Sequence, residues 1–122
     1  MHKKNLIVTA GANLIAQIFA NSGGTRPAAM GVGTNTTAPA IAQTDLQTAL
    51  VRKALTGISR SSNVITYTAL FATGVATGTI QEGGLFSATT AGTMFARFLT
   101  GAFSKASTDQ LTMTWGLRFG TM

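Results

Sequence analysis

Apolar and polar residues alternate without interruption from Gln110 to Phe119, and this alternation constrains the fold more than any other feature of the sequence. Successive side chains of a β-strand point to opposite faces, so a period of two indicates a strand with one buried face. The predicted core face of this strand comprises Leu111, Met113, Trp115, Leu117 and Phe119. The opposite face carries polar and small residues and is expected to meet solvent or an interface.

Several other segments are rich in the β-branched and aromatic residues that favour strands. They are Leu50 to Thr56, Asn63 to Thr73, Gly78 to Phe86 and Thr93 to Leu99, with a shorter strand near Ala28 to Val32. Connections with hairpin-compatible residues occur at Ser59 to Ser62 and at Ser104 to Asp109. The predicted fold class is therefore mainly β: a small antiparallel β-sandwich or barrel with one N-terminal helix and an extended arm.

The predicted helix runs from Thr9 to Asn21. Its apolar residues recur at helical spacing and form one stripe, which comprises Leu14, Ile15, Ile18 and Phe19. Thr9 is expected to cap the start of the helix, and Gly23 and Gly24 are expected to end it. The stripe can cover one face of a sheet or dock on a neighbouring molecule, and the sequence leaves both roles open.

The segment Gly31 to Asp45 is rich in Gly, Thr and Ala and lacks helical periodicity, which predicts an extended arm or loop. No Gly-Lys-Ser/Thr follows its glycines, so it is not a phosphate-binding loop. Long loops in compact domains usually have a function. We therefore predict a partner-binding arm that acts through Gly31, Gly33, Thr34, Thr36, Thr37 and Pro39.

The chain of 122 residues fits a single domain. We predict a helical segment 1–24, the extended arm 25–49 and an antiparallel β-core 50–122. Charged residues make up only 10% of the chain, against about 25% in a typical domain. A surface with so few charges is expected to be covered by neighbouring molecules, which predicts an assembly protein. Together with the arm, it favours a closed homo-oligomer, with a trimer as the first expectation.

Nine Lys and Arg residues against three acidic residues give a net charge of +6. Nucleic-acid-binding modules usually cluster their basic residues and interleave them with aromatic residues. Here the basic residues are scattered over the whole chain. We therefore expect attraction to an acidic protein surface, and nucleic-acid binding is the less favoured alternative.

No combination of residues predicts catalysis or cofactor binding. The candidate acid and base groups are scattered, at His2, Asp45, Glu82 and Asp109, and the chain has no cysteine. We expect no enzymatic activity, no small-molecule substrate, no metal and no cofactor. The apolar run near the N-terminus is interrupted and does not predict secretion, and no segment has the ~20 apolar residues of a membrane span.

Glu82 is an isolated acid within the predicted strand Gly78 to Phe86. An unpaired charge buried among apolar strands is unfavourable, so a carboxylate there usually pairs with an arginine. Arg52 and Arg97 also lie in predicted strands. We predict a structural ion pair between Glu82 and one of these arginines, and the sequence leaves the choice open.

Landmarks along nearly the whole chain together resemble a family of small proteins encoded in the structural gene clusters of tailed bacteriophages and prophages. They include Lys4-Asn5-Leu6-Ile7, Ala10-Gly11, Asn13-Leu14-Ile15-Ala16, Gly31-Val32-Gly33-Thr34, Thr36-Thr37-Ala38-Pro39, Arg52-Lys53, Gly78-Thr79-Ile80, Glu82 to Phe86, Gly92-Thr93-Met94, Ala96-Arg97, Lys105, Asp109, Leu111 and Trp115. The element Glu82 to Phe86 is also similar to one in phage tail-collar and tail-fibre attachment domains. The chain departs from the family pattern near Ala49, where a glutamate is common, and this argues against a second buried ion pair.

The resemblance implies a structural protein of the virion, assembled in the host cytoplasm, that binds the major capsid protein or tail proteins. Two positions fit: a head decoration (cement) protein that clamps capsid subunits from outside, and a tail, baseplate or tail-fibre adaptor. The short chain, without a repetitive shaft or a receptor-like extension, favours head decoration. A basic nucleic-acid-binding module is a further alternative, which would show salt-dependent affinity for DNA.

Overall fold

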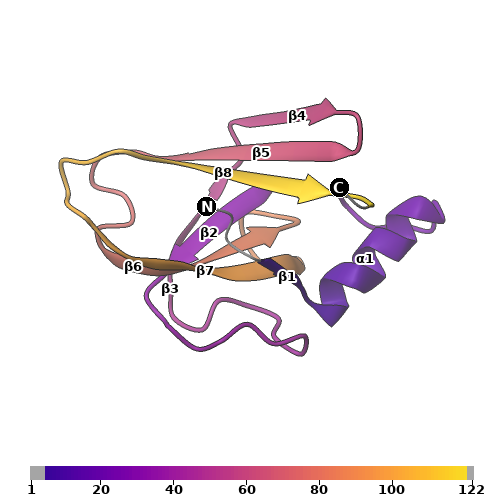
Figure 1. Cartoon of the computed structure of the whole chain (residues 1–122), viewed down its shortest axis with the longest axis horizontal. Helices are drawn as coiled ribbons and strands as arrows, with labels where there is room; N and C mark the ends of the chain where they lie inside the picture. The colour runs from indigo at the N-terminus through magenta and orange to yellow at the C-terminus, as the bar shows by residue number, and fades with distance from the viewer. Residues whose placement is uncertain (1–4, 121–122) are drawn as a thin grey trace.

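The computed structural model describes residues 5–120, which form two antiparallel β-sheets and one helix (Figure 1). In chain order the elements are β1 (Asn5–Ile7), α1 (Thr9–Phe19), β2 (Ala29–Gly33), β3 (Ala49–Ala54), β4 (Gly57–Ser61), β5 (Val64–Phe71), β6 (Gly78–Phe86), β7 (Met94–Lys105) and β8 (Leu111–Arg118). The predicted fold class is confirmed in its sandwich-like form, with open sheets rather than a closed barrel. His2, one of the candidate acid-base residues, lies outside the described residues.

The larger sheet has the strand order β1-β7-β6-β2-β3, and the smaller sheet has the order β4-β5-β8. The chain passes from one sheet to the other after β3, after β5 and after β7. The segment Ser104 to Asp109, predicted as a hairpin connection, therefore leads from one sheet to the other. The segment Ser59 to Ser62 lies mostly in β4, and the hairpin turn itself is formed by Ser62 and Asn63.

The main core lies between the two sheets. Trp115 is 4% exposed and meets Phe98 of β7 in an edge-to-face contact, with 4.5 Å between the ring centroids. Leu111, Met113 and Leu117, which share its face of β8, are half-buried and pack against this core. The alternation of β8 thus places these four side chains on the inner face.

The prediction that Phe119 belongs to the core is wrong. β8 ends at Arg118, and the side chain of Phe119 is 38% exposed. Its ring centroid lies 6.3 Å from that of Phe19, at the end of α1. The physical reason is that Phe119 lies one residue beyond the end of β8, so the strand no longer holds its side chain against the opposing sheet.

The helix α1 packs on β7 through its buried residues Gly11 and Leu14. A Cβ atom on Gly11 would clash with the backbone of Phe95, so the close approach of helix and strand requires glycine here. Ile15 is half-buried, whereas Ile18 is 36% and Phe19 is 77% exposed. The first half of the predicted apolar stripe therefore covers the sheet, and the second half is left uncovered.

The ends of α1 differ in part from the prediction. Thr9 is the first helical residue rather than the cap; Val8 takes the N-cap position and makes no side-chain cap bond. The backbone N–H of Thr9 donates instead to the carbonyl of Ile41. The helix ends at Phe19, and Gly23 follows with a positive φ of 105°, which glycine adopts without strain.

A second, smaller core lies on the outer face of the larger sheet, beneath the loop 34–48. It consists of Val8, Ala29, Leu46, Phe86 and Met94. Gly31 of β2 and Gly84 of β6 are paired in register, and a Cβ atom on either would lie within 3.2 Å of a Leu46 methyl group. The two glycines thus leave room for Leu46 to lie on the sheet. Figure 1 shows the loop between β2 and β3 on the side of this sheet away from β4, β5 and β8.

Two of the six residues named for the partner-binding arm belong to the sheet. Gly31 and Gly33 lie in β2, a buried strand that pairs with β3 on one side and with β6 on the other. A Cβ atom on Gly33 would clash with the carbonyl of Thr48 and the carboxylate of Glu82. These glycines therefore permit close packing rather than the flexibility of an arm, and the irregular segment is limited to the loop 34–48.

The sequence analysis did not predict β1 or β4. Within residues 5–120, β1 has three residues and pairs with β7. β4 has the sequence Gly-Ile-Ser-Arg-Ser, and all five residues are exposed. It buries neither face, so its sequence shows no alternation of apolar and polar residues from which a strand could be predicted.

Candidate functional site

A buried ion pair joins the two longest strands of the larger sheet. Glu82 of β6 and Arg97 of β7 are both fully buried, and Arg97 Nε donates to Glu82 Oε1 at 3.0 Å. Arg97 is the cross-strand partner of Gly84, so Glu82 is its diagonal neighbour on the same face. Of the two arginines that the sequence left open, the structure pairs Arg97 with Glu82.

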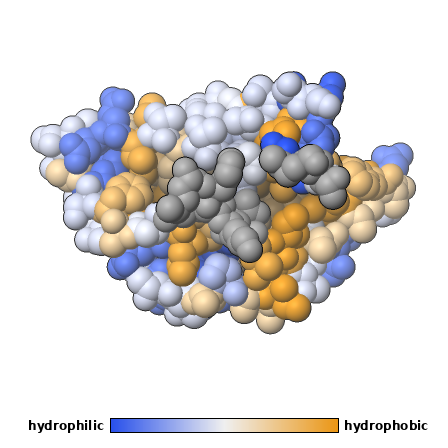
Figure 2. Space-filling view, in the orientation of Figure 1, coloured by the Kyte–Doolittle hydropathy of each residue, from blue (hydrophilic) through white to orange (hydrophobic). Residues whose placement is uncertain are grey.

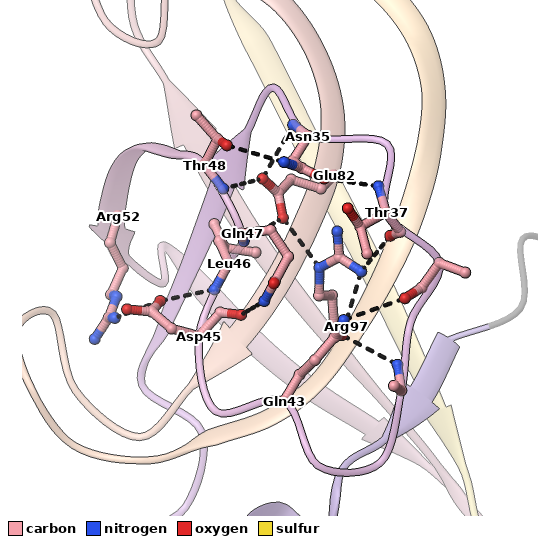
Figure 3. A network of polar contacts seen from close by, with 12 residues as sticks. Asn35, Thr37, Gln43, Asp45, Leu46, Gln47, Thr48, Arg52, Glu82 and Arg97 are labelled. Atoms are coloured by element: carbon pink, nitrogen blue, oxygen red, sulfur yellow. Dashed lines mark hydrogen bonds and ion pairs between the residues drawn. The ribbon is translucent and has the colours of Figure 1, made fainter.

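Backbone amides of the loop 34–48 surround the carboxylate of Glu82 (Figure 3). Oε1 also accepts from the N–H of Gln47 at 2.9 Å. Oε2 accepts from the N–H of Asn35 at 3.1 Å and from that of Thr48 at 2.8 Å. Each carboxylate oxygen therefore accepts two hydrogen bonds, and both ends of the loop are tied to one buried charge.

Arg97 holds the middle of the same loop. Its Nη1 donates to the carbonyl of Thr37 at 2.7 Å and to Oε1 of Gln43 at 3.3 Å. The Gln43 amide in turn accepts from the N–H of Ala40 and donates to the carbonyl of Ala38. The other terminal nitrogen, Nη2, is buried with no hydrogen-bond partner among the described residues. The guanidinium therefore depends on its carboxylate partner for charge compensation.

The remaining residues of the predicted partner-binding arm lie in this loop. The N–H of Thr34 donates to the carbonyl of Thr48 at 3.0 Å and closes the base of the loop. Thr36 and Thr37 are exposed, and Pro39 is half-buried. Because the buried ion pair anchors the loop at several points, these residues form a fixed surface rather than a freely extending arm.

Arg52 has a different role from the one proposed as an alternative. Its guanidinium stacks on the ring of Phe86, 3.6 Å from the centroid, and Nη1 donates to the carbonyls of Ala88 and Ala91. Its Nη2 lies 3.6 Å from a carboxylate oxygen of Asp45. Arg52 thus holds the turn between β6 and β7 against the outer face of the sheet.

Sequence analysis named Lys105, at the end of β7, only as a landmark of the resemblance and did not predict that this cation is buried. It is 3% exposed, and its Nζ donates to the carbonyl of Ala72 at 3.0 Å and to that of Asp109 at 2.7 Å. Lys105 therefore ties together the two connections, after β5 and after β7, that pass between the sheets. A lysine beside serines at a strand end carries no sequence signal for such a role, because its partners are backbone carbonyls.

An open apolar groove lies where α1 meets the two sheets. Its volume is about 140 Å³, and it is lined by Ile15, Ile18, Phe19, Arg26, Pro27, Ile65, Tyr67, Phe95, Leu117 and Phe119. Figure 2 shows hydrophobic colouring on the surface beside α1. The groove combines the exposed half of the apolar stripe of α1 with the residues at and just after the end of β8. The sequence analysis described these two features separately and did not predict that they meet.

The groove contains a buried tyrosine and an exposed arginine. Burial raises the pKa of the Tyr67 hydroxyl above its ordinary value of 10.0, and the charge of Arg26 opposes this shift. Tyr67 is 3% exposed, whereas Arg26 lies at the surface. The arginine is thus the cationic member of an otherwise largely apolar lining.

The three acidic residues of the chain all interact with neighbouring groups of the same chain. Glu82 is paired as described above, Asp45 approaches Arg52, and Asp109 accepts a hydrogen bond from the N–H of Ala106. Within residues 5–120, no group of three or more His, Cys, Asp or Glu residues could hold a metal ion. In the same part of the chain, α1 has 11 residues and is too short to cross a membrane.

No protein-family model matches the chain, and a search of curated proteins finds no significant match. The function is therefore inferred from the surface and buried network of the chain itself, together with the resemblance of its landmarks.

Proposed function

We propose that this chain is a non-enzymatic structural protein of a tailed-bacteriophage particle and that it decorates the outer surface of the head. The observation that carries the proposal is the apolar surface beside α1, with Phe19 77% exposed next to the uncovered Phe119. Contiguous apolar surface of this kind in a small domain marks a contact with another molecule. The landmarks that resemble those of phage structural proteins support the virion as the setting of that contact.

The distribution of charge favours an acidic partner. Three of the four edge strands carry a cation: Lys53 on β3, Arg60 on β4 and Arg118 on β8. Charged residues on edge strands discourage direct strand pairing between copies. With its acidic side chains engaged inside the chain, the protein presents a basic surface that suits an acidic shell.

The anchored loop supports a role as a rigid clamp. The Glu82–Arg97 pair fixes the loop 34–48 at both ends and in its middle, so binding a partner would require little additional ordering of the loop. A protein that prefers the assembled shell over its separate subunits stabilises the shell by mass action.

Self-association forms part of the proposal, with a closed trimer as the first expectation. It is supported by the charged share of only 10%, which leaves much neutral surface. Native mass spectrometry at micromolar concentration tests it, and a purely monomeric protein contradicts it.

A tail, baseplate or tail-fibre adaptor is the alternative position. It is favoured by the element Glu82 to Phe86, which resembles one in tail-collar and tail-fibre attachment domains. In the structure this element forms the central part of the larger sheet and includes the buried carboxylate.

Immunogold electron microscopy of particles of the encoding phage tests the proposal and separates the two positions. We expect label distributed over the head surface. Label confined to the tail supports the alternative, and particles that contain no copy of the chain contradict both.

A further inference from the structure

The groove beside α1 is a built apolar surface rather than a single exposed residue. It draws on the helix, on both sheets and on the residue after β8, and its floor includes the buried Tyr67 and Phe95. The walls are formed by partly exposed side chains: Ile18 is 36% exposed, Phe119 is 38% exposed and Phe19 is 77% exposed. A ligand that enters the groove would therefore find an ordered floor and apolar walls.

The charges near the groove distinguish between possible occupants. Among the described residues, Arg26 is the only charged one in the lining, so an anionic group is favoured beside an apolar body. A second copy of the chain is poorly suited to this groove, because it would have to supply a carboxylate beside Arg26. Its three acidic side chains are engaged with their own neighbours, as described above.

We propose that the groove is the docking site for a segment of another virion protein that presents an apolar side chain next to a carboxylate. The apolar side chain would enter between Phe19 and Phe119 and contact Tyr67, and the carboxylate would lie beside Arg26. This inference rests on the proposed function for the identity of the partner, but the chemistry of the groove can be tested without the virion.

Two fluorescent probes test that chemistry on the purified full chain. Anilinonaphthalene sulfonate joins an apolar aromatic body to an anion, and N-phenylnaphthylamine has the same body without the charge. We expect the anionic probe to bind more tightly than the neutral one. Because Arg26 is exposed, Arg26→Gln should weaken binding of the anionic probe by about two- to five-fold and leave the neutral probe unchanged.

Phe19→Asp tests the apolar wall, and Leu70→Asp serves as the matched control. Leu70 is 38% exposed and alternates with the inward-facing Ala69 and Phe71, so it lies on the outer face of the smaller sheet. Phe19→Asp should weaken binding of both probes by at least about ten-fold, and Leu70→Asp should leave it unchanged. Circular dichroism identifies any variant that fails to fold; for such a variant, Phe19→Ser replaces the aspartate.

The same variants are then tested for incorporation into phage particles. We expect Leu70→Asp to be incorporated at the parental level and Phe19→Asp to be depleted at least about ten-fold. If the parent itself is absent from particles, the proposed function fails while the probe results still decide whether the groove binds.

Three outcomes overturn the proposal. The first is equal binding of the probes to the parent and to Phe19→Asp. The second is full incorporation of Phe19→Asp into particles. The third is conversion of an oligomeric parent to a monomer by Phe19→Asp, in a sedimentation experiment where Leu70→Asp has no effect, because the occupant would then be a second copy.

Discussion

Replacing Glu82 by glutamine tests the buried network sharply, because it removes the charge and leaves the shape nearly unchanged. Each oxygen of the carboxylate accepts two N–H donors. A glutamine side chain offers one oxygen and one NH2 group. Whichever way the amide is turned, two donors would therefore face another donor, and Arg97 would lose its counter-charge in a fully buried position.

The expected magnitude follows from this geometry. Removing one partner of a buried ion pair destabilises a protein by about 3–5 kcal/mol. Buried donors left without an acceptor are unfavourable by about 1–3 kcal/mol each, and the two contributions overlap. We expect Glu82→Gln to lower the free energy of unfolding by about 4 kcal/mol, a large share of the about 5–15 kcal/mol of a typical domain.

Urea unfolding followed by the fluorescence of Trp115, the single tryptophan, measures this change. The control is Asp45→Asn, which alters a pair whose carboxylate is 62% exposed and lies 3.6 Å from Arg52 Nη2. It should change the free energy of unfolding by less than about 1 kcal/mol. Hydrogen exchange adds a local readout, because the amides of Asn35, Gln47 and Thr48 should exchange faster in the Glu82 variant.

A double variant, Glu82→Met with Arg97→Met, distinguishes the network from a simple ion pair. Replacing both charges of a buried pair by apolar residues is often neutral. Here it would leave three backbone amides without their acceptor, so the double variant should remain less stable than the parent. The reasoning is refuted if Glu82→Gln is as stable as Asp45→Asn, because the carboxylate would then not anchor the loop.

Trp115→Ala should lower the free energy of unfolding by about 3–5 kcal/mol, because the ring is 4% exposed and packs edge-on against Phe98; denaturation followed by circular dichroism measures this, and an unchanged midpoint contradicts it. Gly11→Ala should destabilise the fold, although alanine in a helix interior is normally favourable by about 1 kcal/mol, because its methyl group would meet the backbone of Phe95; a raised melting temperature contradicts this. The raised pKa of Tyr67 means that the folded state binds the phenolic proton more tightly, so this contribution to stability is present below pH 10.0 and is lost as the pH rises through the folded-state pKa. Ultraviolet titration of this single tyrosine should give a midpoint above 10.0, and Tyr67→Phe should remove that part of the alkaline loss of stability.

Some of the fold could be predicted from the sequence because it depends on local patterns. The bounds of β6 match the predicted segment Gly78 to Phe86, and the alternation in β8 placed Trp115 in the core. The same pattern failed at Phe119, because alternation states which face a residue occupies and not how far the opposing sheet extends over it.

The partner of Glu82 was partly predictable. Burial of an acid in an apolar strand required an arginine, and the pairing of β6 with β7 places Arg97 diagonally across from it on the same face. The remaining acceptor bonds come from backbone amides of residues 34–48, and any residue type except proline supplies such an amide. No residue pattern could therefore show that this loop folds onto the carboxylate.

The groove could not be predicted, because it is formed where incomplete coverage of two elements coincides. The apolar stripe of α1 and the end of β8 are each visible in the sequence, but their proximity depends on how the helix packs on β7. The glycines of β2 were misassigned for a related reason. In the sequence, Gly31 and Gly33 resemble part of a flexible arm. In the structure they lie in the sheet, where Leu46 packs against Gly31 and the Glu82 carboxylate lies close to Gly33, so that a Cβ atom would be crowded at Gly31 and would clash at Gly33.

The copy number of this chain in purified particles tests the central claim most directly. Quantitative mass spectrometry against isotope-labelled peptides of this chain and of the major capsid protein gives the molar ratio. Decoration of symmetry-related sites over the whole head predicts a ratio of about one. A ratio far below one would place the chain in the tail, and its absence from purified particles would contradict a structural role in the virion altogether.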